Sequence, residues 1–397
     1  MLDSLTASGL NPNMSPERSA AEELIEELRT DLESRKQAGL LRTLITPSGL
    51  DLTSNDYLDY RTAPELLAGA MEAAARFGTG AGASRLLRGH SDFIGATEAD
   101  LADFSGREAA LLYSSGFAAN IGLMGAIAGP EDRIFSDELN HASLIDGIKL
   151  SKAACSIFRH QDLTHLASLL ARPSTGRRFI VTESLFSMDG DLTDLVALCE
   201  LARKHHAMVV VDEAHSTGIY GKRGSGRVEA LGLAPEVLCT MHTGGKALGV
   251  GGAWIAGDHH LIEHLVNHSR SFIYSTAPVP PLVGALRAAV QKRSTSPESA
   301  EHLLDTATWF RSLLRENNLD ILNTESQIIP VMIGDSERAT EIATSLQEEG
   351  FDVRAVRPPT VPAGTSRLRL TLRCSLNRDD LIELQRCLTR HLRGNTP

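Results

Sequence analysis

Helical segments alternate with short apolar runs between about residues 65 and 275, and this alternation constrains the fold more than any other feature. The helical segments lie at 65–77, 93–104, 117–127 and 193–206. The apolar runs lie at 109–113, 133–135, 179–182, 208–211 and 253–256. Apolar runs of this length suit strands that are buried on both faces. The pattern therefore predicts an α/β fold with a mostly parallel sheet that carries helices on both faces.

The composition changes after Pro278, which marks a second domain. Helical periodicity continues at 281–293, 299–316, 336–349 and 378–392, with strand-like runs at 328–333 and 367–372. This mixture predicts a smaller α+β domain. Near the N-terminus, Ser15-Pro16-Glu17 is a good helix start, and apolar residues follow at helical spacing. We therefore expect an N-terminal helical segment at 1–60, a large domain at 61–278 and a smaller C-terminal domain at 279–397.

Charge and cysteine content exclude several classes of protein. The 397 residues carry a formal net charge of −11, which argues against broad binding to nucleic acids or anionic membranes. The five cysteines are scattered and form no C-x-x-C pair, so we expect neither a disulfide framework nor a structural zinc site. A reducing cytoplasm is the simpler environment for them. The sequence contains neither a secretory signal nor a run of ~20 apolar residues that could span a membrane.

Two short segments of the large domain carry the most specific chemistry. One is a run of valines that ends in Asp212 and continues to His215, and the other places Lys246 in a glycine-rich turn after Thr243. Ligands of parallel sheets bind beyond the carboxyl ends of strands, where we expect Asp212 and Glu183. A lysine can form a Schiff base with pyridoxal phosphate (PLP), and an aspartate can keep its pyridine nitrogen protonated. The two segments together predict a PLP site.

Each of these residues has a plainer interpretation when it is taken alone. Lys246 could be a surface lysine in a loop, and Asp212 could be a strand-end carboxylate that caps the next helix. Asp212 and His215 could also suggest a metal, but no second cluster of carboxylates and histidines with matching spacing accompanies them. We therefore expect PLP and no metal. His215 fits a hydrogen bond to the phenolic oxygen of the cofactor or to Asp212.

Further polar residues follow predicted strands and could complete such a site. Ser115, Gly116 and Phe117 open a predicted helix, where exposed N–H groups bind phosphate well, although many helices begin this way. The Thr243 hydroxyl could donate to the same phosphate. His141 could stack on the pyridine ring, unless it is a structural histidine.

A substrate carboxylate would also need a ligand. Arg367 is the candidate, because a guanidinium group makes two parallel hydrogen bonds to a carboxylate. Arg369 has the same parity on the predicted strand, so the pattern does not choose between the two. Ser187 lies in a strand-end loop, where an ordinary turn hydroxyl is the plainer interpretation.

Taken in order, these motifs resemble the α-oxoamine synthases, a branch of the fold-type I PLP enzymes. The resemblance covers nearly the whole chain. The segments that carry it are Ser54 to Leu58, Gly82 to Leu86, Ser115 to Phe117, Asn140 to Ser143, Glu183 to Gly190, Asp212 to Gly218, Thr243 to Lys246, Tyr274 to Thr276 and Arg357 to Leu370.

The resemblance implies a role for each candidate. Lys246, His141, Asp212 and His215 would be catalytic: Lys246 as Schiff base and proton-transfer base, Asp212 as partner of the pyridinium nitrogen, and His141 as the stacking ring. The cofactor would be bound by Ser115, Gly116, Phe117, Ser187, Asp212, His215, Thr243 and Lys246. Ser275 and Thr276 would reach the phosphate from a partner subunit, which implies an obligate homodimer with shared sites.

The implied reaction joins an amino acid to an acyl thioester with loss of CO2. The stretch from Arg357 to Gly364 most resembles the biotin-pathway branch, which implies L-alanine and a pimeloyl thioester of CoA or acyl carrier protein as substrates. Arg367 would hold the substrate carboxylate, and Arg42 would help to place the acyl chain. Glycine or serine as substrate, a longer acyl chain, a PLP aminotransferase or aldolase, and a non-catalytic scaffold stay open as alternatives.

Overall fold

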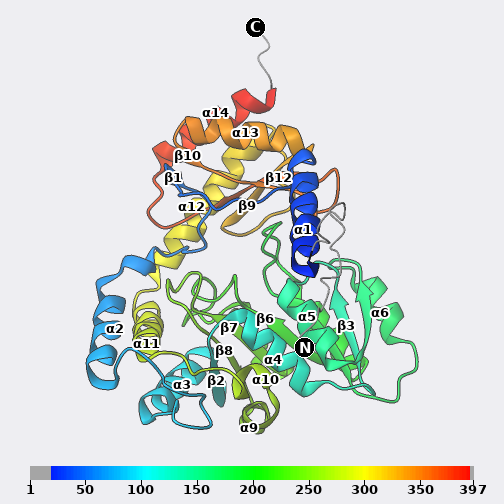
Figure 1. The fold of residues 1–397 in the computed structure, drawn as a ribbon, viewed down its shortest axis with the longest axis vertical. Helices are drawn as coiled ribbons and strands as arrows, with labels where there is room; N and C mark the ends of the chain where they lie inside the picture. The colour runs from blue at the N-terminus through cyan, green and yellow to red at the C-terminus, as the bar shows by residue number, and fades with distance from the viewer. Residues whose placement is uncertain (1–18, 394–397) are drawn as a thin grey trace, which may run out of the picture. The chain divides into compact units, whose positions relative to one another are not determined.

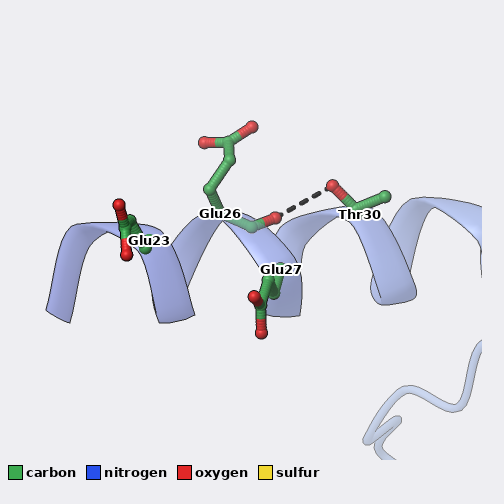
Figure 2. A pocket seen from close by; sticks show the side chains of 4 residues that line it. All are labelled: Glu23, Glu26, Glu27 and Thr30. Atoms are coloured by element: carbon green, nitrogen blue, oxygen red, sulfur yellow. Dashed lines mark hydrogen bonds between the residues drawn. The ribbon is translucent and has the colours of Figure 1, made fainter. Parts of the chain in front are cut away.

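The computed structural model describes residues 19–393, and contacts group the chain into two compact units, residues 1–47 and 48–397. The first unit contains helix α1 (Ala20–Gln37), which begins with a capping box between Ser19 and Glu22. The helix start predicted at Ser15-Pro16-Glu17 lies outside the described residues. Figure 2 shows four side chains of α1 that line a surface hollow, and Thr30 Oγ1 among them donates to the Glu26 carbonyl at 2.9 Å. No residue of α1 is buried, so this hollow offers no enclosed ligand site.

A seven-stranded sheet with the order β2-β8-β7-β6-β5-β3-β4 forms the centre of the second unit (Figure 1). Its strands are β2 (Ala109–Tyr113), β3 (Arg133–Asp137), β4 (Ala154–Phe158), β5 (Arg178–Glu183), β6 (Met208–Asp212), β7 (Cys239–Thr243) and β8 (Ala253–Gly257). β8 runs antiparallel to both of its neighbours, and the pairs from β4 to β7 are parallel. The predicted mostly parallel sheet is confirmed.

Successive side chains of each strand enter different cores, because they point to opposite faces of the sheet. Val210 packs in a core with helices α4 and α5, whereas Val209 and Val211 pack in another core with α6 and α7. The helices around the sheet are α2 (Pro64–Phe77), α3 (Asp92–Ser105), α4 (Gly116–Ile127), α5 (Ala142–Ser151), α6 (Leu163–Leu170), α7 (Leu195–Lys204), α8 (Arg227–Ala230), α9 (His259–His268), α10 (Arg270–Ile273) and α11 (Pro280–Thr295). Burial on both faces explains why these strands read as continuous apolar runs.

A smaller three-stranded antiparallel sheet, β11-β12-β9, lies with helices α13 and α14 (Figure 1). The elements of this region are α12 (Glu298–Glu316), β9 (Ile328–Gly334), α13 (Ser336–Glu348), β10 (Phe351–Asp352), β11 (Ala355–Val356), β12 (Ser366–Thr371) and α14 (Arg378–Arg393). β1 (Leu50–Asp51) pairs with β10, so residues that precede the large sheet pack with the C-terminal part of the chain. The predicted three-part domain division stays a prediction.

The sequence pattern did not predict two strands of the large sheet and several of the helices around it. β4 is an edge strand whose first residues are exposed, so it lacks a continuous apolar run. β7 is buried but contains Thr240 and His242, whose side chains bond to one another at 2.7 Å. Among the described residues, we find no helix with the length and apolar character needed to cross a membrane.

Candidate active site

The predicted site residues follow the carboxyl ends of neighbouring strands. Asp212 ends β6 and Glu183 ends β5, and these two residues pair directly in the sheet register. Thr243 ends β7 shortly before Lys246, and His141 follows β3. Because the carboxyl ends of parallel strands meet at one edge, the sheet collects side chains that are distant in the sequence.

Lys246 is half-buried and has acidic neighbours. Its Nζ lies 2.6 Å from Nε2 of His215. Burial lowers the pKa of Lys246 to about 8, against the opposing charge of Asp212, and the charge of Arg369 adds to the decrease. A lysine that forms imines must supply its neutral amine, and this environment increases the neutral fraction.

Gly249 fixes the turn that carries Lys246. Its N–H donates to the Lys246 carbonyl at 2.8 Å, and its φ of +66° lies in the left-handed region. A Cβ atom at this position would overlap the backbone of Tyr60 and Arg61. Only glycine fits here, so the glycine-rich turn seen in the sequence has a steric cause.

The Asp212 carboxylate is buried and accepts two hydrogen bonds. Asn120 Nδ2 donates to Oδ2 at 2.8 Å, and the Ala214 amide donates to Oδ1 at 2.8 Å. The two donors fix the orientation of the carboxylate that would pair with the ring nitrogen of PLP. Asn120 belongs to α4, so the helix that opens at Ser115 also supports Asp212.

Glu183 adds a second carboxyl group beside Asp212. Burial raises the pKa of Glu183 well above its ordinary value, and the charge of Asp212 raises it further. Glu183 is therefore the protonated member of the pair. Its Oε1 accepts a hydrogen bond from the His141 amide at 2.7 Å, which ties the start of α5 to the end of β5.

The two site histidines have different surroundings. His141 is exposed, and its Nδ1 lies 2.7 Å from Ser143 Oγ. Burial of part of the ring lowers the pKa of His141 against the charge of Asp212, which favours the neutral imidazole. His215 is 5% exposed and lies between Lys246 and Tyr57, whose hydroxyl is 2.6 Å from Nδ1. Burial, together with the charge of Lys246, holds the pKa of His215 well below its usual range.

The predicted phosphate ligands share one corner of the site. Ser115 caps α4, and its Oγ accepts from the Ala118 amide at 3.2 Å. The N–H groups of Gly116 and Phe117 lie in the first helical turn, where no intrahelical acceptor is available. A Cβ on Gly116 would lie 3.9 Å from the Thr243 Cβ. A helix N-terminus and a threonine hydroxyl at one corner suit a phosphate group.

Arg369 is the arginine of β12 whose charge acts on the reactive lysine. Arg369 Nε donates to the Ser187 carbonyl at 2.6 Å, and Nη2 donates to Asn55 Oδ1 at 3.0 Å. Its charge lowers the pKa of Lys246 and of His215. Arg367 is buried and forms an ion pair with Asp189. The family resemblance assigned the substrate carboxylate to Arg367, and this assignment stays a prediction. Arg369 is the second candidate, and the Ser187 carbonyl accepts a hydrogen bond from it.

The other predicted residues lie apart from this set. Thr276 forms an isolated bridge with Ser84, and Ser275 Oγ contacts only the Thr276 carbonyl among the hydrogen bonds described. Arg42 belongs to the first unit and is exposed. The assignments of Ser275 and Thr276 to a partner's phosphate, and of Arg42 to an acyl chain, stay predictions.

The donor set fits PLP. A buried amine, a doubly hydrogen-bonded carboxylate and a phosphate corner are the three contacts the cofactor needs, and all lie at one edge of the sheet. This arrangement defines a PLP enzyme of fold type I.

Comparison with known proteins also indicates a PLP enzyme of this fold. The family model "Aminotransferase class I and II" matches residues 47–387. The chain is 47% identical over 323 residues to the 8-amino-7-oxononanoate synthase of Anaeromyxobacter dehalogenans, with 81% of each chain covered. Sphingomonas wittichii serine palmitoyltransferase superposes with a TM-score of 0.87 at 27% identity, over 95% of this chain and 98% of that one. The Francisella tularensis 8-amino-7-oxononanoate synthase gives 0.77 at 28% identity, over 87% and 98%.

The chain belongs to the aminotransferase class I and II family. Within that family it is an α-oxoamine synthase, a PLP-dependent acyltransferase. The expectation drawn from the motifs is confirmed.

Sequence reasoning missed several residues that contact this set. Asn120, Tyr57 and Asn55 support Asp212, His215 and Arg369 respectively. Gln327 Nε2 also donates to the His215 carbonyl at 3.1 Å. Tyr57 and Asn55 lay in one motif that the sequence singled out and Asn120 in another, but neither motif indicated their partners.

Proposed function

We propose that this enzyme condenses L-alanine with a pimeloyl thioester, carried on CoA or acyl carrier protein, to give 8-amino-7-oxononanoate, CO2 and the free thiol in biotin synthesis. The observation that carries the chemistry is the Lys246 amine, which lies against His215 and near Asp212, Glu183 and Arg369. The names of the relatives described above support the choice of substrates.

The chain's own residues would hold PLP in defined ways. Lys246 would hold PLP covalently, Asp212 would pair with the ring nitrogen, and His141 would stack on the ring. The Gly116 and Phe117 amides, with Ser115 and Thr243, would bind the phosphate, and Ser187 and His215 would lie on the side of the phenolic oxygen. Bound PLP would supply an electron sink for negative charge at the α-carbon of the amino acid.

Arg369 would orient the amino acid through its carboxylate. A guanidinium at this position can form two parallel hydrogen bonds, and its contacts to Ser187 and Asn55 limit the orientations it can adopt. Lys246 Nζ would then accept the α-proton. A base with a pKa of about 8 is well matched to proton transfer near neutral pH.

A homodimer would complete the site. Large apolar side chains are exposed on the second unit, including Leu87 at 78% and Tyr274 at 74%. Tyr274 directly precedes Ser275 and Thr276, so an interface there would carry both residues toward a neighbouring copy. We place the enzyme in the cytoplasm, where its five cysteines, described as free thiols, would stay reduced.

A substrate panel tests the proposal. Purified protein is mixed with alanine, glycine or serine and with pimeloyl, short-chain or palmitoyl thioesters, and the release of free thiol and CO2 is measured. We expect alanine with a pimeloyl thioester to give the highest kcat/KM. Protein without PLP absorbance, or a Lys246→Ala variant with full activity, contradicts the proposal.

A longer acyl chain with serine is the second candidate, because the serine palmitoyltransferase fold matches over 95% of this chain. Preference for serine and a palmitoyl thioester in the same panel would establish it. Borohydride reduction followed by peptide mapping distinguishes an enzyme from a non-catalytic scaffold, since only a working site labels Lys246.

A further inference from the structure

A buried chain of hydrogen bonds starts at the reactive lysine and passes through two aromatic side chains. Lys246 Nζ lies 2.6 Å from His215 Nε2, and His215 Nδ1 lies 2.6 Å from the Tyr57 hydroxyl. The Tyr57 hydroxyl also lies 3.2 Å from Asn55 Oδ1, which accepts from Arg369 as well. Tyr57 is 0% exposed, so water does not compete for its hydroxyl.

The number of protons limits how this chain can be arranged. His215 is neutral because burial holds its pKa well below the usual range, so its ring carries one N–H. Burial raises the pKa of Tyr57 to about 12, so Tyr57 keeps its O–H proton. His215 therefore donates in one of its two short contacts and accepts in the other. The tautomer of His215 decides whether it donates to Tyr57 through Nδ1 or presents its N–H at Nε2.

Two arrangements satisfy every contact. When the Lys246 ammonium donates to Nε2, the Nδ1–H of His215 donates to the Tyr57 oxygen, and the Tyr57 hydroxyl donates to Asn55. When the Lys246 ammonium loses its proton, Nε2 takes up that proton and the proton on Nδ1 is released to bulk water. The Tyr57 hydroxyl then rotates and donates to Nδ1. Asn55 Oδ1 accepts a hydrogen bond from Arg369 in both arrangements. It therefore still has a donor when the Tyr57 hydroxyl turns away from it.

We propose that Tyr57 is a positioning residue that sets the tautomer of His215, so that Nε2–H faces the site once Lys246 is bound to the cofactor. This inference rests on the proposed function, because the phenolic oxygen of bound PLP would be the acceptor for the Nε2–H group of His215. The Tyr57 hydroxyl reverses its direction by rotation, while Nε2 gains a proton from Lys246 and Nδ1 loses one. Tyr57 thereby links the protonation or covalent state of Lys246 to the ring nitrogen of His215 that carries the hydrogen.

Tyr57→Phe removes this control while it keeps the ring, and Tyr220→Phe is the matched control. The Tyr220 hydroxyl is also buried but has no hydrogen-bond partner among the described residues. In Tyr57→Phe we expect kcat to fall by roughly tenfold to a hundredfold, as is typical when an outer hydrogen-bond partner is lost. The KM for the amino acid should change less than threefold, since Arg369 remains in place. Tyr220→Phe should retain wild-type kcat and KM.

Spectroscopy separates this inference from the proposed function. Absence of PLP absorbance in the wild-type protein contradicts the proposed function itself. With PLP present in both proteins, a Tyr57→Phe variant of unchanged kcat overturns only the role of Tyr57. We also expect the pH midpoint of the cofactor absorbance to shift in Tyr57→Phe. The charged or titratable groups that act on His215 in the wild-type protein are Lys246, Arg369 and His141.

A measurement on the wild-type protein covers the case in which Tyr57→Phe does not fold. Long-range 1H–15N correlation spectra of histidine-labelled protein report the tautomer of each ring, and the His215 signal is assigned by its loss in His215→Gln. We expect the Nε2–H form in the holoenzyme. The Nδ1–H form in the holoenzyme contradicts the proposal.

Discussion

At the scale of single residues, the chemistry of this site depends on what burial does to charged groups. Lys246 and His215 both lose proton affinity because desolvation penalises their charged forms. Glu183 lies beside Asp212 in the sheet, and burial together with the charge of Asp212 raises the pKa of Glu183. The site therefore contains a reactive amine, one carboxylate and neutral imidazoles near neutral pH.

The two arginines of β12 give a prediction at this scale. We expect Arg369→Lys to raise the KM for the amino acid by about tenfold to a hundredfold, because a lysine cannot make two parallel hydrogen bonds to a carboxylate. Arg367→Lys is the matched variant two positions along the same strand, and it should change the KM by less than about threefold. Steady-state kinetics with the acyl thioester held at saturation measures both. The opposite order of effects would favour Arg367 as the carboxylate ligand.

At the scale of elements, His160 connects two loops near the site through its contacts with two aspartates. His160 follows β4 and lies 2.9 Å from Asp137 Oδ1 and 2.7 Å from Asp191 Oδ2. Asp137 ends β3 ahead of His141, and Asp191 belongs to the loop that contains Ser187. A neutral imidazole has one N–H and cannot donate to both carboxylates. Burial would lower the pKa of His160, but the two aspartates outweigh it and raise the pKa to about 10.

His160→Gln should therefore destabilise the protein in a pH-dependent way. Because the pKa of His160 is raised on folding, its contribution is complete below about pH 6.5 and is lost as the pH rises through about 10. We expect the free energy of unfolding to fall by about 2 to 4 kcal/mol at pH 6, with the difference shrinking above pH 7. Urea unfolding at several pH values measures it. His302→Gln, at an exposed site on α12, is the control, and a pH-independent difference contradicts the argument.

The turn after β7 supports a second prediction at the element scale. Gly249→Ala should lower the free energy of unfolding by about 2 to 4 kcal/mol, because its Cβ would overlap the backbone of residues 60 and 61 at a positive φ. It should also reduce the absorbance of bound PLP, since the turn carries Lys246. Gly245→Ala is the control: its Cβ would have no neighbour closer than 3.4 Å. Equal stability and PLP content of the two variants would show that the turn tolerates a side chain.

At the scale of the whole molecule, the proposed dimer makes each site depend on two chains. If Ser275 and Thr276 serve the neighbouring site, a subunit with Lys246→Ala and a subunit with Ser275→Ala and Thr276→Ala have complementary defects. A heterodimer of the two then has one intact site, because an intact Lys246 meets an intact Ser275 and Thr276.

Mixing these two inactive proteins should restore about a quarter of wild-type activity after random exchange of subunits, since half of the dimers would be heterodimers with one working site each. Activity after unfolding and refolding the mixture measures this, and each variant refolded alone is the control. No recovery, with sedimentation confirming heterodimers, would place all site residues within one chain.

The sequence by itself determined the central strands, the Asp212 and Lys246 pair, and the α-oxoamine synthase family. These features are local: a strand buried on both faces must be an apolar run, and a turn closed against backbone must have glycine. Strands β4 and β7 escaped, because an exposed edge and a buried histidine bonded to a distant threonine break the run. Only the tertiary structure showed that the charge of Arg369 acts on Lys246, that Asn120 donates to Asp212, and that the Tyr57 hydroxyl lies against His215. Those contacts join segments far apart along the chain, so their geometry exists only once the sheet has brought the segments to one edge.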